Sequence, residues 1–337
     1  MDSFGKLAML LVEAAIVAYA GALVAYVAEI LVLGSRRPQV AQEAVAAVQP
    51  RVLVASGSGS GGSSVVDAAE VSEASALTGW AARAERFGRL GLTLIVVGFC
   101  FHVGAVVARG IAAGRVPWGN MYEFTTMGSL AAVGVFLVVQ RRRDIGYLGV
   151  WIGAAALLAL GLAVTVFYTE PGPLLPALRS TWLVIHVLAA ITATGLFTVG
   201  AAAAALHLIV ERSERRAAAG LPAGRLDPYL ARVPSSAVLE KVAFRINAVG
   251  FPVWTFAVTA GAIWAQYAWA RYWGWDPKET WAFITWVVYA CYLHARVTAG
   301  WRGRVASSIA LIGYATLLFN FIGVNMLFTG LHSYANI

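Results

Sequence analysis

The stretch that decides how this chain is organised runs from Ala262 to Trp286 and reads AIWAQYAWARYWGWDPKETWAFITW. It holds half of the chain's 12 tryptophans around a short charged core, Asp276 to Glu279, inside a sequence that is otherwise strongly apolar. Aromatic side chains at this density suit an interfacial belt, a packed core or a platform for a large flat aromatic ligand. The segments on either side distinguish these three interpretations.

Composition places the whole chain in a membrane. Of its 337 residues, 60% are hydrophobic and 12% are charged, and the mean hydropathy is +0.73. A water-soluble globule does not have this composition. Apolar runs of roughly 20 residues fit helices that cross a hydrocarbon core of about 30 Å, and the alternating pattern of a membrane barrel is absent. The sequence therefore predicts an all-α, polytopic bundle of transmembrane helices in contact with lipid.

Eight apolar runs predict about eight transmembrane helices. We expect an N-terminal helix within residues 1–33, a flexible cytoplasmic linker at 34–86, rich in Ser and Gly, and a membrane domain at 87–337. The other seven predicted spans are 87–108, 122–139, 145–168, 181–210, 246–268, 281–297 and 305–328.

The positive charges predict the topology. The net charge of +8 comes from basic residues in loops between apolar runs, so nucleic acid is not expected as a partner. Arginines gather in every second loop, which the positive-inside rule assigns to the cytoplasm. The loops 109–121, 169–180 and 269–280 then lie on the outer face together with both termini. Arg109 and Arg115 lie on the side where few positive charges are expected, and such a pair could hold an anionic group.

The two cysteines carry no recognisable chemistry. Cys100 and Cys291 each lie inside an apolar run, without the CxxC spacing of a redox pair or a thiolate metal site. We expect both to be buried and to act as small hydrophobic side chains.

Two histidines share the outer face with the tryptophan-rich stretch. His186 lies at the outer end of the fifth span, and His332 follows the outer end of the eighth. Neutral imidazoles are common ligands of haem iron, so two of them near an aromatic platform could form a bis-histidine site. The alternative for any single membrane histidine is a hydrogen-bonded packing residue.

The remaining histidines lie deeper in the predicted spans. His294 follows Trp281 by 13 positions, which places it about 20 Å below the outer end of the helix. It could be an inner haem ligand. His207 has a similar depth and is either a second inner ligand or an interfacial histidine beside Glu211. His102 is either structural, adjacent to a substrate or a ligand of iron.

Part of the tryptophan-rich stretch is ordinary helix initiation. Asp276 can cap a helix whose first position is Pro277, and Glu279 then lies near the positive end of the helix dipole. Capping does not explain the aromatic residues. A belt places one or two at each interface, whereas several here crowd one short loop, which is enough to line a pocket. The candidate platform runs from Trp264 to Trp275.

The run from Trp264 to Trp281 resembles the WWD signature of haem-handling proteins. Its DPKETW form is typical of the CcsA/ResC-type cytochrome c biogenesis family of the system II pathway, called CcsB in some bacteria. Residues 114–124, GRVPWGNMYEF, and the C-terminal segment 320–334 also resemble that family. The resemblance covers roughly 87–337. One departure is Ala270, where relatives often have glycine.

The resemblance implies a set of haem-binding residues. His186 and His332 would be the external axial ligands of the iron of haem b. His294 would be an inner, intramembrane ligand, completed in this family by a histidine of a ResB-type partner. The face of the macrocycle would lie against the WWD residues, which are Trp264, Trp269, Trp273, Trp275, Asp276 and Trp281.

The resemblance also implies a function. Haem would move to the outer face of the bacterial plasma membrane and be held there while the cysteines of a CxxCH motif in apocytochrome c form thioether bonds with it. A thioredoxin-like pathway would supply the thiols in reduced form, and the chain would be a subunit of a cytochrome c haem lyase, or holocytochrome c synthase. The alternatives are a haem carrier or relay, and a haem-binding regulatory membrane subunit without ligation chemistry.

Overall fold

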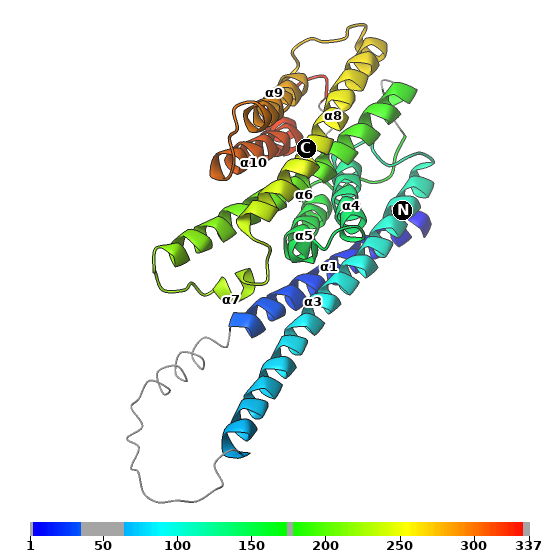
Figure 1. Cartoon of the computed structure of the whole chain (residues 1–337). Helices are drawn as coiled ribbons and strands as arrows, with labels where there is room; N and C mark the ends of the chain where they lie inside the picture. The colour runs from blue at the N-terminus through cyan, green and yellow to red at the C-terminus, as the bar shows by residue number, and fades with distance from the viewer. Residues whose placement is uncertain (1–2, 35–63, 174–177, 333–337) are drawn as a thin grey trace, which may run out of the picture.

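The computed structural model of the chain describes residues 3–34, 64–173 and 178–332, and these residues form helices and no strand (Figure 1). The predicted all-α class is therefore confirmed. The elements, in chain order, are α1 (Ser3–Gly34), α3 (Ser64–Ala113), α4 (Met121–Gln140), the 3-10 turn η1 (Gly146–Leu148), α5 (Gly149–Thr165), α6 (Thr181–Ala218), α7 (Asp227–Leu230), α8 (Ser236–Trp269), α9 (Pro277–Val297), α10 (Arg304–Leu318), the π-helical turn η3 (Phe319–Gly323) and α11 (Val324–Leu327).

A polytopic helical membrane protein is confirmed, with one difference in the number of spans. Seven helical segments of the described chain are long and apolar enough to cross a membrane, the last of them running from α10 through α11. The seventh predicted span, 281–297, is α9 and is not among these seven segments. It has 21 residues, but His294 and Arg296, together with its tryptophans, tyrosines and threonines, make it less apolar than the others.

The predicted linker at 34–86 overlaps a helix. Residues 35–63 lie outside the described residues, whereas α3 begins at Ser64 and continues without a break to Ala113. The second part of the predicted linker is therefore helical. The proposed division of the chain at residues 33 and 86 stays a prediction.

The helices are arranged in successive pairs. The pair of α1 and α3 contacts α4 and α5, these contact the long pair of α6 and α8, and α9 and α10 pack beyond it (Figure 1). Small residues allow close helix approach. At Gly195 of α6, a Cβ atom would come within 2.9 Å of the backbone of Ala131 in α4. In the core, the rings of Phe197 and Tyr289 stack with centroids 3.8 Å apart.

The prediction that both cysteines are buried is wrong. Cys100 and Cys291 are free thiols, and both residues are exposed on the surface of the helix bundle. The reason is that apolar side chains of a membrane protein also cover the surface that contacts lipid or a partner helix. Hydrophobicity therefore predicts that a residue lies within the membrane but does not predict that protein covers it.

Chain direction brings three loops to one end of the bundle. Three loops lie at the same end of the bundle: the loop before α4, the loop before α6 and the loop before α9 (Figure 1). In each case the preceding helix runs toward that end and the following helix runs away from it. The segment that follows α11 reaches the same end, where His332 contacts Asp276. Residues that are more than 200 positions apart in sequence, such as Trp118 and His332, can therefore form one site there.

Candidate functional site

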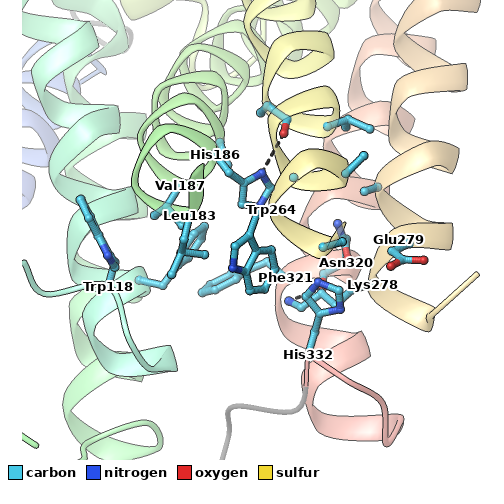
Figure 2. Close-up of a pocket in the computed structure, with 18 of the residues that line it drawn as sticks. Trp118, Leu183, His186, Val187, Trp264, Lys278, Glu279, Asn320, Phe321 and His332 are labelled. Carbon is cyan, nitrogen blue, oxygen red and sulfur yellow. Dashed lines mark hydrogen bonds between the residues drawn. The ribbon is translucent and has the colours of Figure 1, made fainter. Parts of the chain in front are cut away.

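A large pocket opens at this end, between α4, α6, α8, α9 and η3. It is open to solvent on one side, and its lining is mainly apolar and aromatic. Figure 2 shows His186, Trp264, Lys278 and His332 around it. Its apolar and aromatic walls suit a flat, mainly apolar ligand.

His186 lies in the second turn of α6 and points into the pocket (Figure 2). Its Nδ1 lies 2.7 Å from the carbonyl oxygen of Ala257 in α8, so Nδ1–H donates and Nε2 carries the lone pair. Gly261 of α8 makes this position possible, because a Cβ atom there would lie 2.7 Å from Nδ1 of His186. A hydrogen bond of this kind fixes the ring for ligation through Nε2.

His332 has an equivalent support on the other side of the pocket. Its Nδ1 lies 2.9 Å from Oδ1 of Asp276, and the backbone N–H of Leu331 donates to Oδ2 of the same carboxylate at 2.8 Å. Burial would raise the pKa of Asp276, but the hydrogen bonds from His332 and Leu331 outweigh burial and hold that pKa below its ordinary value. The charged carboxylate therefore orients the His332 ring through Nδ1, so that Nε2 is the nitrogen that would ligate a metal.

Trp264 contacts both histidines. Its side chain is buried, its ring lies parallel to that of His186 at 12° with centroids 6.1 Å apart, and it meets His332 edge to face at 5.6 Å. Trp269 packs behind it, with its ring centroid 4.8 Å from Trp264 and 4.7 Å from His332. Trp264 lines the pocket directly, whereas Trp269 supports both rings from outside the lining.

The other predicted platform residues separate in the structure. Trp273 lines the pocket, but Trp275 is 65% exposed and contacts Trp273 edge to face. Trp281 packs against Phe319 with centroids 4.2 Å apart and does not line the pocket. Positive φ angles of 56° at Ala270 and 58° at Trp275 turn the loop sharply, which sends neighbouring indoles in different directions.

The three deeper histidines do not reach the pocket. His294 is exposed on α9. His207 is buried, with Nδ1 2.9 Å from Oγ of Ser307, so it packs inside the bundle rather than at an interface. His102 is fully buried, with Nδ1 3.3 Å from the hydroxyl of Tyr19. The structure brings together two of the three predicted iron ligands.

Arg109 and Arg115 do not face the pocket, contrary to the idea that they hold an external anion. Both bind Glu123, which is fully buried: Nε of Arg109 lies 3.0 Å from its carboxylate and Nη1 of Arg115 lies 2.7 Å from it. The N–H of Gly119 donates to the same carboxylate at 2.8 Å. The cluster fixes the loop before α4, which places Trp118 in the pocket wall.

The loop before α9 has a matching construction. Nη1 of Arg271 lies 3.3 Å from the carboxylate of Glu279, and the N–H of Gly274 donates to that carboxylate at 2.7 Å. In both loops the glycine follows a tryptophan of the pocket wall, and the glutamate is the third residue after the N-cap of the next helix. The shared sequence signal is an arginine and Trp-Gly before a helix start in which an Asn or Asp N-cap is followed three residues later by Glu. This signal could have identified Trp118.

The chain matches known proteins over most of its length. Residues 118–332 match the family described as Cytochrome C assembly protein. Proteins named Cytochrome c biogenesis protein CcsA are 34% identical in Synechocystis sp. over 276 residues, covering 67% of this chain and 82% of the relative. The protein of that name from Trieres chinensis is 32% identical over 278 residues, covering 76% of this chain and 88% of the relative.

The matched range begins and ends with pocket residues, Trp118 and His332. It also contains the whole tryptophan-rich stretch, 262–286, that carries the resemblance. The resemblance to CcsA-type proteins is therefore confirmed. This chain belongs to the cytochrome c assembly protein family.

Proposed function

We propose that the pocket holds haem b as the substrate of cytochrome c maturation, with its iron ligated by His186 and His332. One observation carries the proposal. These two histidines come from elements far apart in sequence, yet both reach one apolar, tryptophan-lined pocket, and in both the Nδ1 atom is hydrogen-bonded to an oxygen. This arrangement presents Nε2, a usual atom for iron ligation.

The chain would contribute binding and orientation to the covalent step. Each thiol of a CxxCH motif adds across one vinyl group of haem: a carbon–sulfur bond forms, the vinyl π bond breaks, and the thiol hydrogen ends on the other vinyl carbon. Nothing is oxidised or reduced. Trp264 and Trp273 would hold the macrocycle against the pocket wall, and two histidine ligands would hold the iron until the CxxCH histidine displaces one of them.

His294 supports a second part of the proposal, an inner haem site shared with a ResB-type partner. The outward face of α9 carries Phe283, Val287, Cys291 and His294, all exposed. A histidine is costly in contact with lipid, so this face suits a partner helix that contributes a second ligand. Haem would pass from this site to the pocket on the extracytoplasmic side of the bacterial plasma membrane.

Co-expression tests the function. The full chain, a ResB-type partner and an apocytochrome with one CxxCH motif are produced together in cells without other maturation proteins. We expect haem that stays on the cytochrome after denaturing electrophoresis. Haem that is found in the membrane complex without a covalent product would instead support a carrier or regulatory subunit.

Histidine variants test the ligands. His186→Ala or His332→Ala should remove most of the haem absorbance assigned to the pocket in the purified complex, and added imidazole should restore it because imidazole can occupy the space of the lost side chain. His207→Gln is the matched control and should leave this absorbance unchanged, because His207 lies outside the pocket. Unchanged spectra in both alanine variants would refute the assignment.

A further inference from the structure

The charges that line the pocket are few. Among the described lining residues, Lys278 is the one lysine or arginine and Glu279 the one with a carboxylate. Glu279 is already neutralised by Arg271 and accepts hydrogen bonds from the N–H groups of Gly274 and Asp276. Lys278 is therefore the lining side chain whose positive charge has no carboxylate in contact and remains to interact with a ligand.

Lys278 has a neutral hydrogen-bond partner. In the first turn of α9, its Nζ donates to the carbonyl oxygen of Asn320 at 3.1 Å and lies 5.8 Å from the ring centroid of Phe321 (Figure 2). The ion pairs found among the described residues involve arginines and His332, and none involves Lys278. An ammonium group inside an apolar pocket thus lacks a carboxylate in contact.

Burial is unfavourable for this charge. Lys278 precedes the predicted span 281–297, and burial lowers its pKa to about 7 even though nearby Asp276 opposes the shift. An anionic group brought in by a ligand would form a charge-assisted hydrogen bond and offset the cost of burial. The arginines cannot take this role, because Arg109, Arg115 and Arg271 are bound to Glu123 and Glu279 and do not line the pocket.

We infer that Lys278 binds a carboxylate of the pocket's ligand and thereby sets the rotation of the macrocycle about the iron. The inference rests on the proposed function, in which the ligand is haem. Haem carries its two propionates on one edge and its vinyl groups away from that edge. Anchoring a propionate at Lys278 directs the vinyl groups away from α9, so this lysine determines which side of the pocket the CxxCH thiols must approach.

Esterification of the ligand provides the test. The purified complex of the full chain with its ResB-type partner is titrated with haem and with haem dimethyl ester, in which both carboxylates are blocked. Only the absorbance that His332→Ala removes is counted. Wild type should bind haem about tenfold or more tightly than the ester, as expected for a charge-assisted hydrogen bond. Lys278→Met should weaken haem binding by the same factor and leave ester binding unchanged.

Two variants control for folding and charge. Lys241→Met removes an exposed lysine of α8 outside the pocket and should change neither affinity. Lys278→Arg keeps the positive charge and should keep a preference for haem over its ester, which tests the inference even where Lys278→Met does not fold. Equal losses for haem and ester in Lys278→Met, or equal affinities of wild type for both, would overturn the inference. A wild type that binds neither porphyrin would refute the proposed function itself.

Discussion

Asp276 performs two tasks with one carboxylate. Oδ1 accepts from the N–H of Lys278 and so caps α9, and it also accepts from Nδ1 of His332. Gly330 permits this contact, because a Cβ atom at this position would overlap the carboxylate. The capping role is visible in the local sequence, but the second role depends on a segment 56 positions away. The cap of one helix is thus also the support of a candidate iron ligand.

Ala270 gives a prediction at the same scale. It ends α8 in the left-handed conformation, with φ 56°, which costs a residue with a Cβ atom about 1–2 kcal/mol. This explains why glycine suits the position. Ala270→Gly should stabilise the chain by up to about 1 kcal/mol, because the relief of strain exceeds the extra entropy of the unfolded chain.

The measurement is thermal unfolding of the detergent-solubilised protein, together with haem affinity. We expect a higher Tm and unchanged affinity, since Ala270 does not line the pocket. Ala268→Gly is the matched control, because this residue lies inside α8, where glycine should lower the Tm. A fall in Tm for both variants would contradict the strain argument.

At the scale of elements, the loops before α4 and α9 use the same construction to hold a tryptophan in the pocket wall. In each loop an arginine pairs with the glutamate three residues after the N-cap. At α9 this glutamate completes a capping box, whereas at α4 Glu123 accepts from the N–H of Gly119 instead. They differ in burial. Glu123 is fully buried beside two arginines, whereas the side chain of Arg271 is 30% exposed beside Glu279. The clamp before α4 should therefore tolerate the loss of its carboxylate less well.

Removing each carboxylate tests this difference. Glu123→Gln should destabilise the protein by about 3 kcal/mol or more, because it leaves buried arginines without a counter charge, and should weaken haem binding by displacing Trp118. Glu279→Gln should be milder. The control is Glu85→Gln, which breaks the exposed pair with Arg89 and should cost about 1 kcal/mol at most. Chemical or thermal unfolding measures all three, and a Glu123→Gln cost no larger than that of Glu85→Gln would refute a structural clamp.

At the scale of the whole molecule, alternating helix direction gathers the pocket-lining loops at one end of the bundle (Figure 1). The charge pattern predicts that this end is extracytoplasmic, since the arginine-rich loops lie at the other end. Apolar helices in membranes fix the axis of the bundle but not its orientation. Orientation is therefore a separate prediction from the fold.

Labelling of single cysteines tests the orientation. In a variant with both exposed cysteines replaced by serine, a cysteine at Gly172, in the loop before α6, should react with a membrane-impermeant maleimide in intact cells. A cysteine at the exposed Arg142, between α4 and η1, should react only after permeabilisation. The reverse pattern would place the pocket on the cytoplasmic side and contradict delivery of haem to an external cytochrome.

The sequence by itself determined the helical class, the positions of the spans and the cap of α9. These are local properties, because hydrophobic length, charge in loops and capping each depend on residues within a few turns of one another. The boundaries of the helices depend on more than hydrophobicity. Helix α3 begins at Ser64, 23 residues before the predicted span at 87, because residues with helix propensity continue a helix beyond its apolar part. The histidines flanking the tryptophans were also found from sequence.

Only the tertiary structure decided which of these residues meet. Trp264 and Trp273 line the pocket while Trp275 and Trp281 do not, although all four belong to the same motif. The supports of the two histidines come from residues 71 and 56 positions away, and Trp118 joins them from a loop before α4. The reason is physical: side-chain direction follows from loop dihedral angles and helix packing, which a pattern along one chain segment does not contain.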